Sequence, residues 1–214
     1  MDDKQRYRRL RLLTKKLNKD RKKQNQKIDI LCNDLIAAQR NFIKRLGIIS
    51  FVGNFYESII GTTDLNKLLY TAVEFFKSEN TDINVTFFLR QEENFELFMF
   101  ESGEPIPIEK QYIESCFTPE LMDNISKSNK VCSLDDMFAM GLQGNLNELN
   151  KISAVTIPLG LLGSSLGFIL AYRSSENKIT ADEIGRISAV ISGLSRAITS
   201  CQTLSRAADQ SNCN

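Results

Sequence analysis

A heptad pattern near the N-terminus is the feature that most constrains the fold of this chain. From residue 28 to residue 59, apolar residues recur at alternating spacings of three and four, and Arg45 is the one interruption. A seam kept over about four repeats is typical of a helix that pairs with other helices. The seam positions that we expect at a dimer interface are Ile28, Leu31, Leu35, Phe42 and Ile49.

A second heptad pattern lies near the C-terminus. Thr180 is followed three residues later by Glu183, and this capping-box sequence predicts the start of a helix. Apolar residues then recur at alternating spacings of three and four. We expect this helix to join the first in a dimeric coiled coil or helical bundle. Its expected interface positions are Ile184, Ile187, Ile191, Leu194 and Ile198.

The segment between the two seams changes from helical to strand periodicity. "GTTDLNKLLYTAVEFF" predicts a helix stop and a new helix, and "INVTFFL" and "FELFMFE" around the polar "RQEEN" predict a β-hairpin. Further along, the sequence predicts a helical crossing over Pro105–Lys130, a short strand at "KVCSL", and a polar, glycine-interrupted lid over Asp135–Lys151.

The apolar stretch "VTIPLGLLGSSLGFILAY" (155–172) allows two interpretations. A phosphate-binding loop would need a lysine or the spacing G-x-G-x-x-G, followed by a helix, and the stretch has neither motif. A β-rich run follows the glycines instead. We therefore expect two strands joined by the turn "LGSS".

Charge is distributed unevenly along the chain. Residues 1–27 carry a net charge of +9, and the other 187 residues carry −8. We therefore divide the chain into a basic extension that is helical or partly disordered (1–27), a coiled-coil-like helix (28–60), a globular domain with its C-terminal helix (61–208) and a frayed tail (209–214). The basic residues 4–27 could bind nucleic acid or an anionic membrane. A solvated helix or a partner-docking arm explains them more simply.

The chain contains no histidine, which excludes the commonest general base and the commonest metal ligand. Its five cysteines are scattered and include no CxxC pair. Together with the charged N-terminus, which has no signal-peptide pattern, this predicts reduced thiols in the cytoplasm. We expect no enzymatic activity, no metal and no identifiable cofactor.

The pattern as a whole resembles the GAF domain family over about residues 55–203. The resemblance is carried by "VTIPLGLLGSSLGFILAYRSSENKITADEIGRISAVISGLSRAI" and, upstream, by "TTDLNKLLYTAVEFFKSENTDINVTFFL". It implies an α+β fold in which an antiparallel sheet of about five to six strands is flanked by helices. The terminal helices would cover one face of the sheet. A ligand pocket, or its remnant, would lie on the other face under the lid.

A ligand in such a pocket would meet side chains of the lid and of the first hairpin. Phe87 and Phe88 must face opposite sides of the sheet, so one of them could line the pocket. The expected ligand-binding residues are Phe87, Phe88, Asp135, Asp136, Met140, Gln143 and Asn145. Some GAF relatives reduce methionine sulfoxide with cysteines of this region, so Cys116 and Cys132 allow a thiol reductase as a minor alternative. Their apolar surroundings favour buried core residues.

These features predict a dimeric, non-enzymatic, small-molecule sensor or regulatory protein in signal transduction. Binding of an unknown ligand or partner would be transmitted through the flanking helices to a separate output protein. A ligand-free dimerisation scaffold is the first alternative. A regulator that binds nucleic acid or membrane through the basic N-terminus is the second.

Overall fold

The computed structural model describes residues 3–79, 82–92, 94–100, 110–145, 149–161 and 163–212. The chain divides into two units, Met1–Ile49 and Ser50–Asn214. The first helix, α1 (Asp3–Ile59), runs through the end of the first unit into the second. The elements after it are, in chain order, α2 (Leu65–Glu79), β1 (Asn84–Gln91), β2 (Asn94–Met99), α3 (Lys110–Cys116), α4 (Pro119–Ser128), β3 (Cys132–Ser133), α5 (Leu134–Ala139), β4 (Ile152–Leu161), β5 (Ser164–Ser174) and α7 (Ala181–Asn212).

The first unit is a single helix whose described side chains are almost all exposed. The sequence predicted a basic extension and a separate coiled-coil helix, and the structure has one continuous helix through both, Gly47 and Gly53 included. The seam residues Ile28, Leu31, Leu35, Phe42 and Ile49 have exposed fractions between 55% and 66%. Within a single chain this apolar seam is therefore uncovered.

The same helix changes its role at residue 50. Phe51, Phe55 and Ile59 are buried in the core of the second unit, and Val52 and Tyr56 pack against that core. The last turns of α1 therefore belong to the globular domain. The heptad spacing continues across this point because a buried helix face and a coiled-coil seam have nearly the same period.

The second unit is built on a five-stranded antiparallel sheet in the order β2-β1-β5-β4-β3. The predicted hairpin of residues 155–172 is present as β4 and β5, which pair along their whole length. A register shift lies between Leu159 and Gly160, and Gly163 in the turn has φ +87°. The glycines of this stretch thus shape a hairpin and not a phosphate loop.

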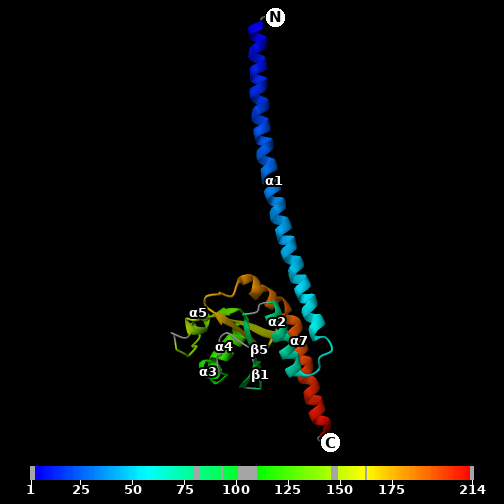
Figure 1. Ribbon diagram of the computed structural model, residues 1–214, viewed down its shortest axis with the longest axis vertical. Coiled ribbons are helices and arrows are strands. Elements are labelled where there is room, and N and C mark those ends of the chain that lie inside the picture. Colours follow the sequence, from blue (N-terminus) through cyan, green and yellow to red (C-terminus); the bar gives the residue numbers. More distant parts are fainter. Residues whose placement is uncertain are drawn as a thin grey trace. The chain divides into compact units, whose positions relative to one another are not determined.

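Two cores lie on the two faces of the sheet, with α2 and α7 on one side and α3, α4 and α5 on the other (Figure 1). β1 shows how the sheet separates them. Phe87 is fully buried in the core beneath α2 and α7, whereas its neighbour Phe88 stacks on Phe168 in the opposite core at a centroid distance of 4.6 Å. The predicted alternation of these two side chains is therefore observed.

The C-terminal helix α7 uses its heptad face inside its own chain. Ile187, Leu194 and Ile198 are almost completely buried against the sheet, while Ile184 and Ile191 are partly buried beside them. This corrects the expected place of Ile187, Leu194 and Ile198 at a dimer interface, because these three have no surface left for a second chain. A sheet accepts a helix face of this spacing as readily as another helix does.

Gly193 allows a close contact between α7 and the last turns of α1. A Cβ atom at this position would lie 2.3 Å from the ring of Tyr56. By contrast, a Cβ at Gly185, two turns earlier on the same helix, would meet no atom within 4 Å. Gly193 thus admits a second helix against α7, and that helix is α1 of the same chain.

The segment predicted as one helical crossing contains two helices in its described part. Thr118 caps α4 by accepting a hydrogen bond from the backbone N–H of Leu121 at 3.3 Å, and Pro119 occupies the first turn. Proline has no N–H group and clashes with the preceding turn, so it starts a helix and cannot continue one. The predicted helical crossing is therefore present, in its described part, as two helices.

Arg173, at the end of β5, holds the start of α7 in place. Its guanidinium donates to both carboxylate oxygens of Glu183 at 2.9 Å and to the backbone oxygens of Asn177 and Lys178 at 2.6 Å, and it also donates to Asp82 at 3.2 Å. The arginine side chain is only 8% exposed. The predicted capping box is present as well, since the Thr180 N–H donates to Glu183 at 2.6 Å. The junction between hairpin and helix is thus fixed by charge and by capping.

Candidate functional site

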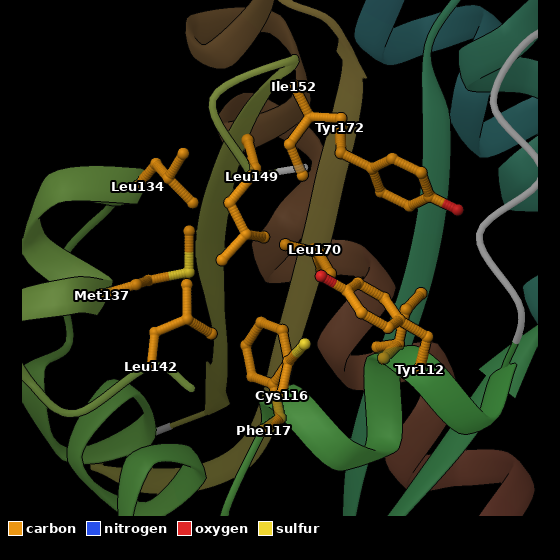
Figure 2. Close-up of a pocket in the computed structure, with 12 residues that line it drawn as sticks. Tyr112, Cys116, Phe117, Leu134, Met137, Leu142, Leu149, Ile152, Leu170 and Tyr172 are labelled. Atoms are coloured by element: carbon orange, nitrogen blue, oxygen red, sulfur yellow. The ribbon is translucent and has the colours of Figure 1, made fainter. Parts of the chain in front are cut away.

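The candidate site is a small cavity on the face of the sheet that α3 and α5 cover. Its volume is about 30 Å³. Figure 2 shows side chains of the two helices, of the lid and of the strands converging on it. The lining residues are Tyr112, Ile113, Cys116, Phe117, Leu134, Met137, Leu142, Leu149, Ile152, Ala154, Leu170 and Tyr172.

The chemistry of this lining is almost wholly apolar. Among the described lining residues there is no carboxylate, amide or basic side chain, and the polar groups are two phenols and one thiol. Burial raises the pKa of Tyr172 to about 12, so this phenol stays protonated and uncharged at neutral pH. The cavity therefore suits an uncharged, apolar group. Ligand pockets usually measure roughly 300–1,000 Å³, so a whole ligand would need the cover to move.

The cover is the part of the predicted lid that follows α5. Leu142 and Leu149 point into the cavity from it (Figure 2), and both side chains line it. At Gly144, with φ +156°, a Cβ would stand 2.8 Å from the Leu149 side chain and 3.2 Å from Cys116 Sγ. The Gln143 N–H donates to the Cys116 carbonyl oxygen at 3.1 Å. Among the described residues, the side chains of Leu142 and Leu149 and the hydrogen bond from Gln143 thus connect the lid to the cavity lining and to α3.

The structure places the predicted ligand-binding residues outside this lining. Phe87 lies in the core on the other face of the sheet, so it cannot reach the cavity. Phe88 is on the correct face, but it is enclosed by Phe117 and Phe168. Of the lid residues, Asp135, Asp136, Gln143 and Asn145 are exposed, and Met140 is partly buried against the core. Asn147 and Glu148, which also belong to the predicted lid, lie outside the described residues.

Asp136 has a structural role instead. Its carboxylate accepts hydrogen bonds from the Ser133 hydroxyl at 2.6 Å and from the Ser133 N–H at 2.8 Å, and it completes a capping box for α5. These hydrogen bonds lower the pKa of Asp136. Sequence reasoning chose the polar residues of the lid, but the apolar ones contact the cavity. The signal that could have found them was the presence of apolar residues, among them Met137, Leu142 and Leu149, within the predicted lid.

The described residues do not form a set that would suggest catalysis. They include no group of three or more His, Cys, Asp and Glu side chains able to hold a metal ion. Cys116 and Cys132 are each 4% exposed, while Cys32 on α1 is exposed. Buried thiols in apolar surroundings are weak nucleophiles. Among the described helices, none is long and apolar enough to cross a membrane.

Comparison with known structures identifies the architecture. The GAF domain of a phosphoenolpyruvate-protein phosphotransferase from Coxiella burnetii superposes with a TM-score of 0.54 over 75% of this chain and 98% of its own, at 10% identity. The GAF domain of the phosphoenolpyruvate-protein phosphotransferase from Acinetobacter superposes with a TM-score of 0.53. The match covers 72% of this chain and 94% of that domain, at 11% identity. The second unit has the fold of a GAF domain.

A third structure with the GAF-like fold carries a bound ligand. It is a far-red absorbing domain with biliverdin IXα, and it superposes with a TM-score of 0.50 over 71% of this chain and 99% of its own, at 16% identity. No protein-family model matches the sequence, and no curated protein matches it significantly. At these identities the likeness establishes the fold and leaves the function to be argued from the residues.

Proposed function

We propose that this chain is a non-enzymatic regulatory module of the GAF type, which works as a dimer in the cytoplasm and signals to a separate protein. The observation that carries the proposal is the uncovered apolar seam of α1, where five heptad positions are each more than half exposed. A soluble helix with such a seam gains stability when a second helix covers it. The simplest second helix is α1 of another copy.

The GAF-like domain would supply the sensing part of this module. Its cavity is apolar and closed by a short lid, so the favoured ligand is small and uncharged. Opening of the lid would move α5 and the end of α3, and both pack on the sheet whose other face carries α7 and the end of α1. A ligand can shift this packing only if it binds one arrangement more tightly than the other.

A ligand-free scaffold is the alternative, and the small volume of the cavity supports it. A pocket of about 30 Å³ is close to the space needed by one water molecule. In that case the side chains of the domain would serve as the permanent filling of the pocket. The dimer would then hold its partner without responding to a metabolite.

A thermal-shift screen with small uncharged metabolites separates the two functions. A ligand at 100 times its dissociation constant adds about 2.7 kcal/mol, which for a domain of this size raises Tm by roughly 5–10 °C. We expect Ala154→Val, which fills the cavity, to abolish the shift. Val131→Ala, an exposed position outside the lining, should retain it. If no compound shifts Tm in the unmodified chain, the scaffold is the better description.

A further inference from the structure

A second, polar hollow lies at the opposite end of α4 from its proline. It measures about 610 Å³ and is formed by the C-terminal end of α4, the end of β1 and the turn between β4 and β5. Its chemistry is the reverse of the apolar cavity, because it is lined by basic, amide and hydroxyl side chains and by the hairpin backbone. The side chains that matter are Arg90, Ser126, Lys127, Asn129, Ser164 and Ser165.

Arg90 brings a positive charge with unused donor capacity to this hollow. The guanidinium lies over the ring of Phe95, 5.2 Å from its centroid, and its Nη2 donates to Asp123. Its Nε is buried and has no hydrogen-bond partner among the described residues. A buried donor without a partner costs about 1–3 kcal/mol, so a group that accepts from it would be stabilised.

Ser126 is the second unusual donor. The residue is 5% exposed, and its Oγ has no hydrogen-bond partner among the described residues. Its neighbour Ser128 behaves in the ordinary way and donates to the Ile125 carbonyl at 2.8 Å, as Ser115 does to Tyr112 at 2.7 Å. Ser126 lines the hollow, so an acceptor bound there would give this hydroxyl the partner that it lacks among the described residues.

The balance of charge selects the kind of group. Asp123 forms an ion pair with Arg90, and its Oδ2 lies 3.7 Å from Lys127 Nζ. One carboxylate thus faces two basic groups, and these three side chains together keep a net positive charge. Asp123 itself does not line the hollow. Lys127 also offsets the negative end of α4 in its last turn. On the hairpin side, the Ser165 Oγ accepts from the Gly167 N–H at 3.4 Å, which leaves its own proton for a ligand.

We propose that this hollow binds a small oxyanion, a phosphate or carboxylate group, with Arg90 and Ser126 as its principal donors. Arginine presents its N–H groups in a planar fork that matches both kinds of oxyanion. The Ser126 hydroxyl, which lacks a partner among the described residues, gains one from the anion. The proposal is independent of the apolar cavity, so either site can be present without the other.

The test is a titration of the full chain at low salt with inorganic phosphate and, in a second arm, with succinate. We expect saturable binding of at least one probe, which also tells phosphate from carboxylate recognition. Arg90→Gln should weaken it about tenfold or more, and Ser126→Ala about threefold to tenfold. The exposed Lys151→Gln serves as a control of equal charge change and should bind as the unmodified chain does.

Folding and binding are distinguished by the serine variant. Ser126→Ala removes a buried hydroxyl for which the described part of the chain offers no partner, so its Tm should be unchanged or higher. A loss of affinity with an intact Tm therefore reports a contact to the anion. The proposal is overturned if neither probe saturates up to roughly 10 mM, or if Ser126→Ala and Arg90→Gln bind the probes as tightly as Lys151→Gln does.

Discussion

Gly167→Ala is expected to leave little folded protein, with a loss in the free energy of unfolding of more than about 4 kcal/mol. Gly167 has φ +128° in β5, the strand between β1 and β4. A Cβ atom would lie 1.9 Å from the Phe88 carbonyl oxygen and 2.9 Å from its carbon. Both contacts are with backbone of the neighbouring strand, so the methyl group can be accommodated only by separating the two strands.

A matched control lies in the same hairpin. Gly163 also has a positive φ, +87°, but a Cβ there would meet no atom within 4 Å. Gly163→Ala should therefore lower the free energy of unfolding only by the cost of a positive φ for alanine, roughly 1–2 kcal/mol. Urea unfolding followed by circular dichroism measures both variants. Equal losses at the two positions would show that the close approach of β1 and β5 at Gly167 is unimportant.

Arg173→Met is expected to cost about 3–5 kcal/mol of unfolding free energy, because it removes one partner of a largely buried ion pair. Glu183 would lose its two hydrogen bonds from the guanidinium, and the carbonyl oxygens of Asn177 and Lys178 would lose theirs. The double variant Arg173→Met, Glu183→Met should recover part of the loss, since it also removes the largely buried Glu183 carboxylate that Arg173→Met alone leaves without the guanidinium. A double variant that is less stable than the single one would contradict this account.

The same ion pair gives the stability a pH dependence with a definite sign. Burial raises the pKa of Glu183, but hydrogen bonds from Thr180 and Arg173 and the attraction of the Arg173 charge outweigh it, so the pKa is lowered. A carboxyl whose pKa is lower in the folded state contributes stability above its unfolded pKa, near 4.3. That contribution is lost as the pH falls through the folded pKa. Arg173→Met should therefore show a weaker acid transition than the unmodified chain.

Local signals in the sequence were sufficient for much of the GAF-like fold. Two hairpins followed from alternating apolar residues around polar or glycine turns, and the capping pair of Thr180 and Glu183 marked the start of α7. Each of these features depends on residues close together in the chain. The opposite placement of Phe87 and Phe88 followed from strand geometry alone.

The features that sequence reasoning missed depend on contacts between distant residues. The apolar spacing of α7 does not say whether a sheet or another helix will cover it, and the sheet covers Ile187, Leu194 and Ile198. Likewise, the position of Arg173 at the end of an apolar strand does not reveal that Asp82 and Glu183 meet it there. In the lid, polarity drew attention to Asp135 and Gln143, whereas Leu142 and Leu149 face the cavity.

The dimer formed through α1 is the central claim, and the mass of the full chain in solution tests it most directly. Light scattering at micromolar concentration should give about 48 kDa, twice the chain mass of 24.2 kDa. Leu35→Glu with Phe42→Glu places charges on the seam and should give the monomer mass. Ala37→Glu, on the opposite side of the helix, should remain dimeric. A mass of 24.2 kDa for the unmodified chain, or a dimer that survives both seam substitutions, would contradict the account.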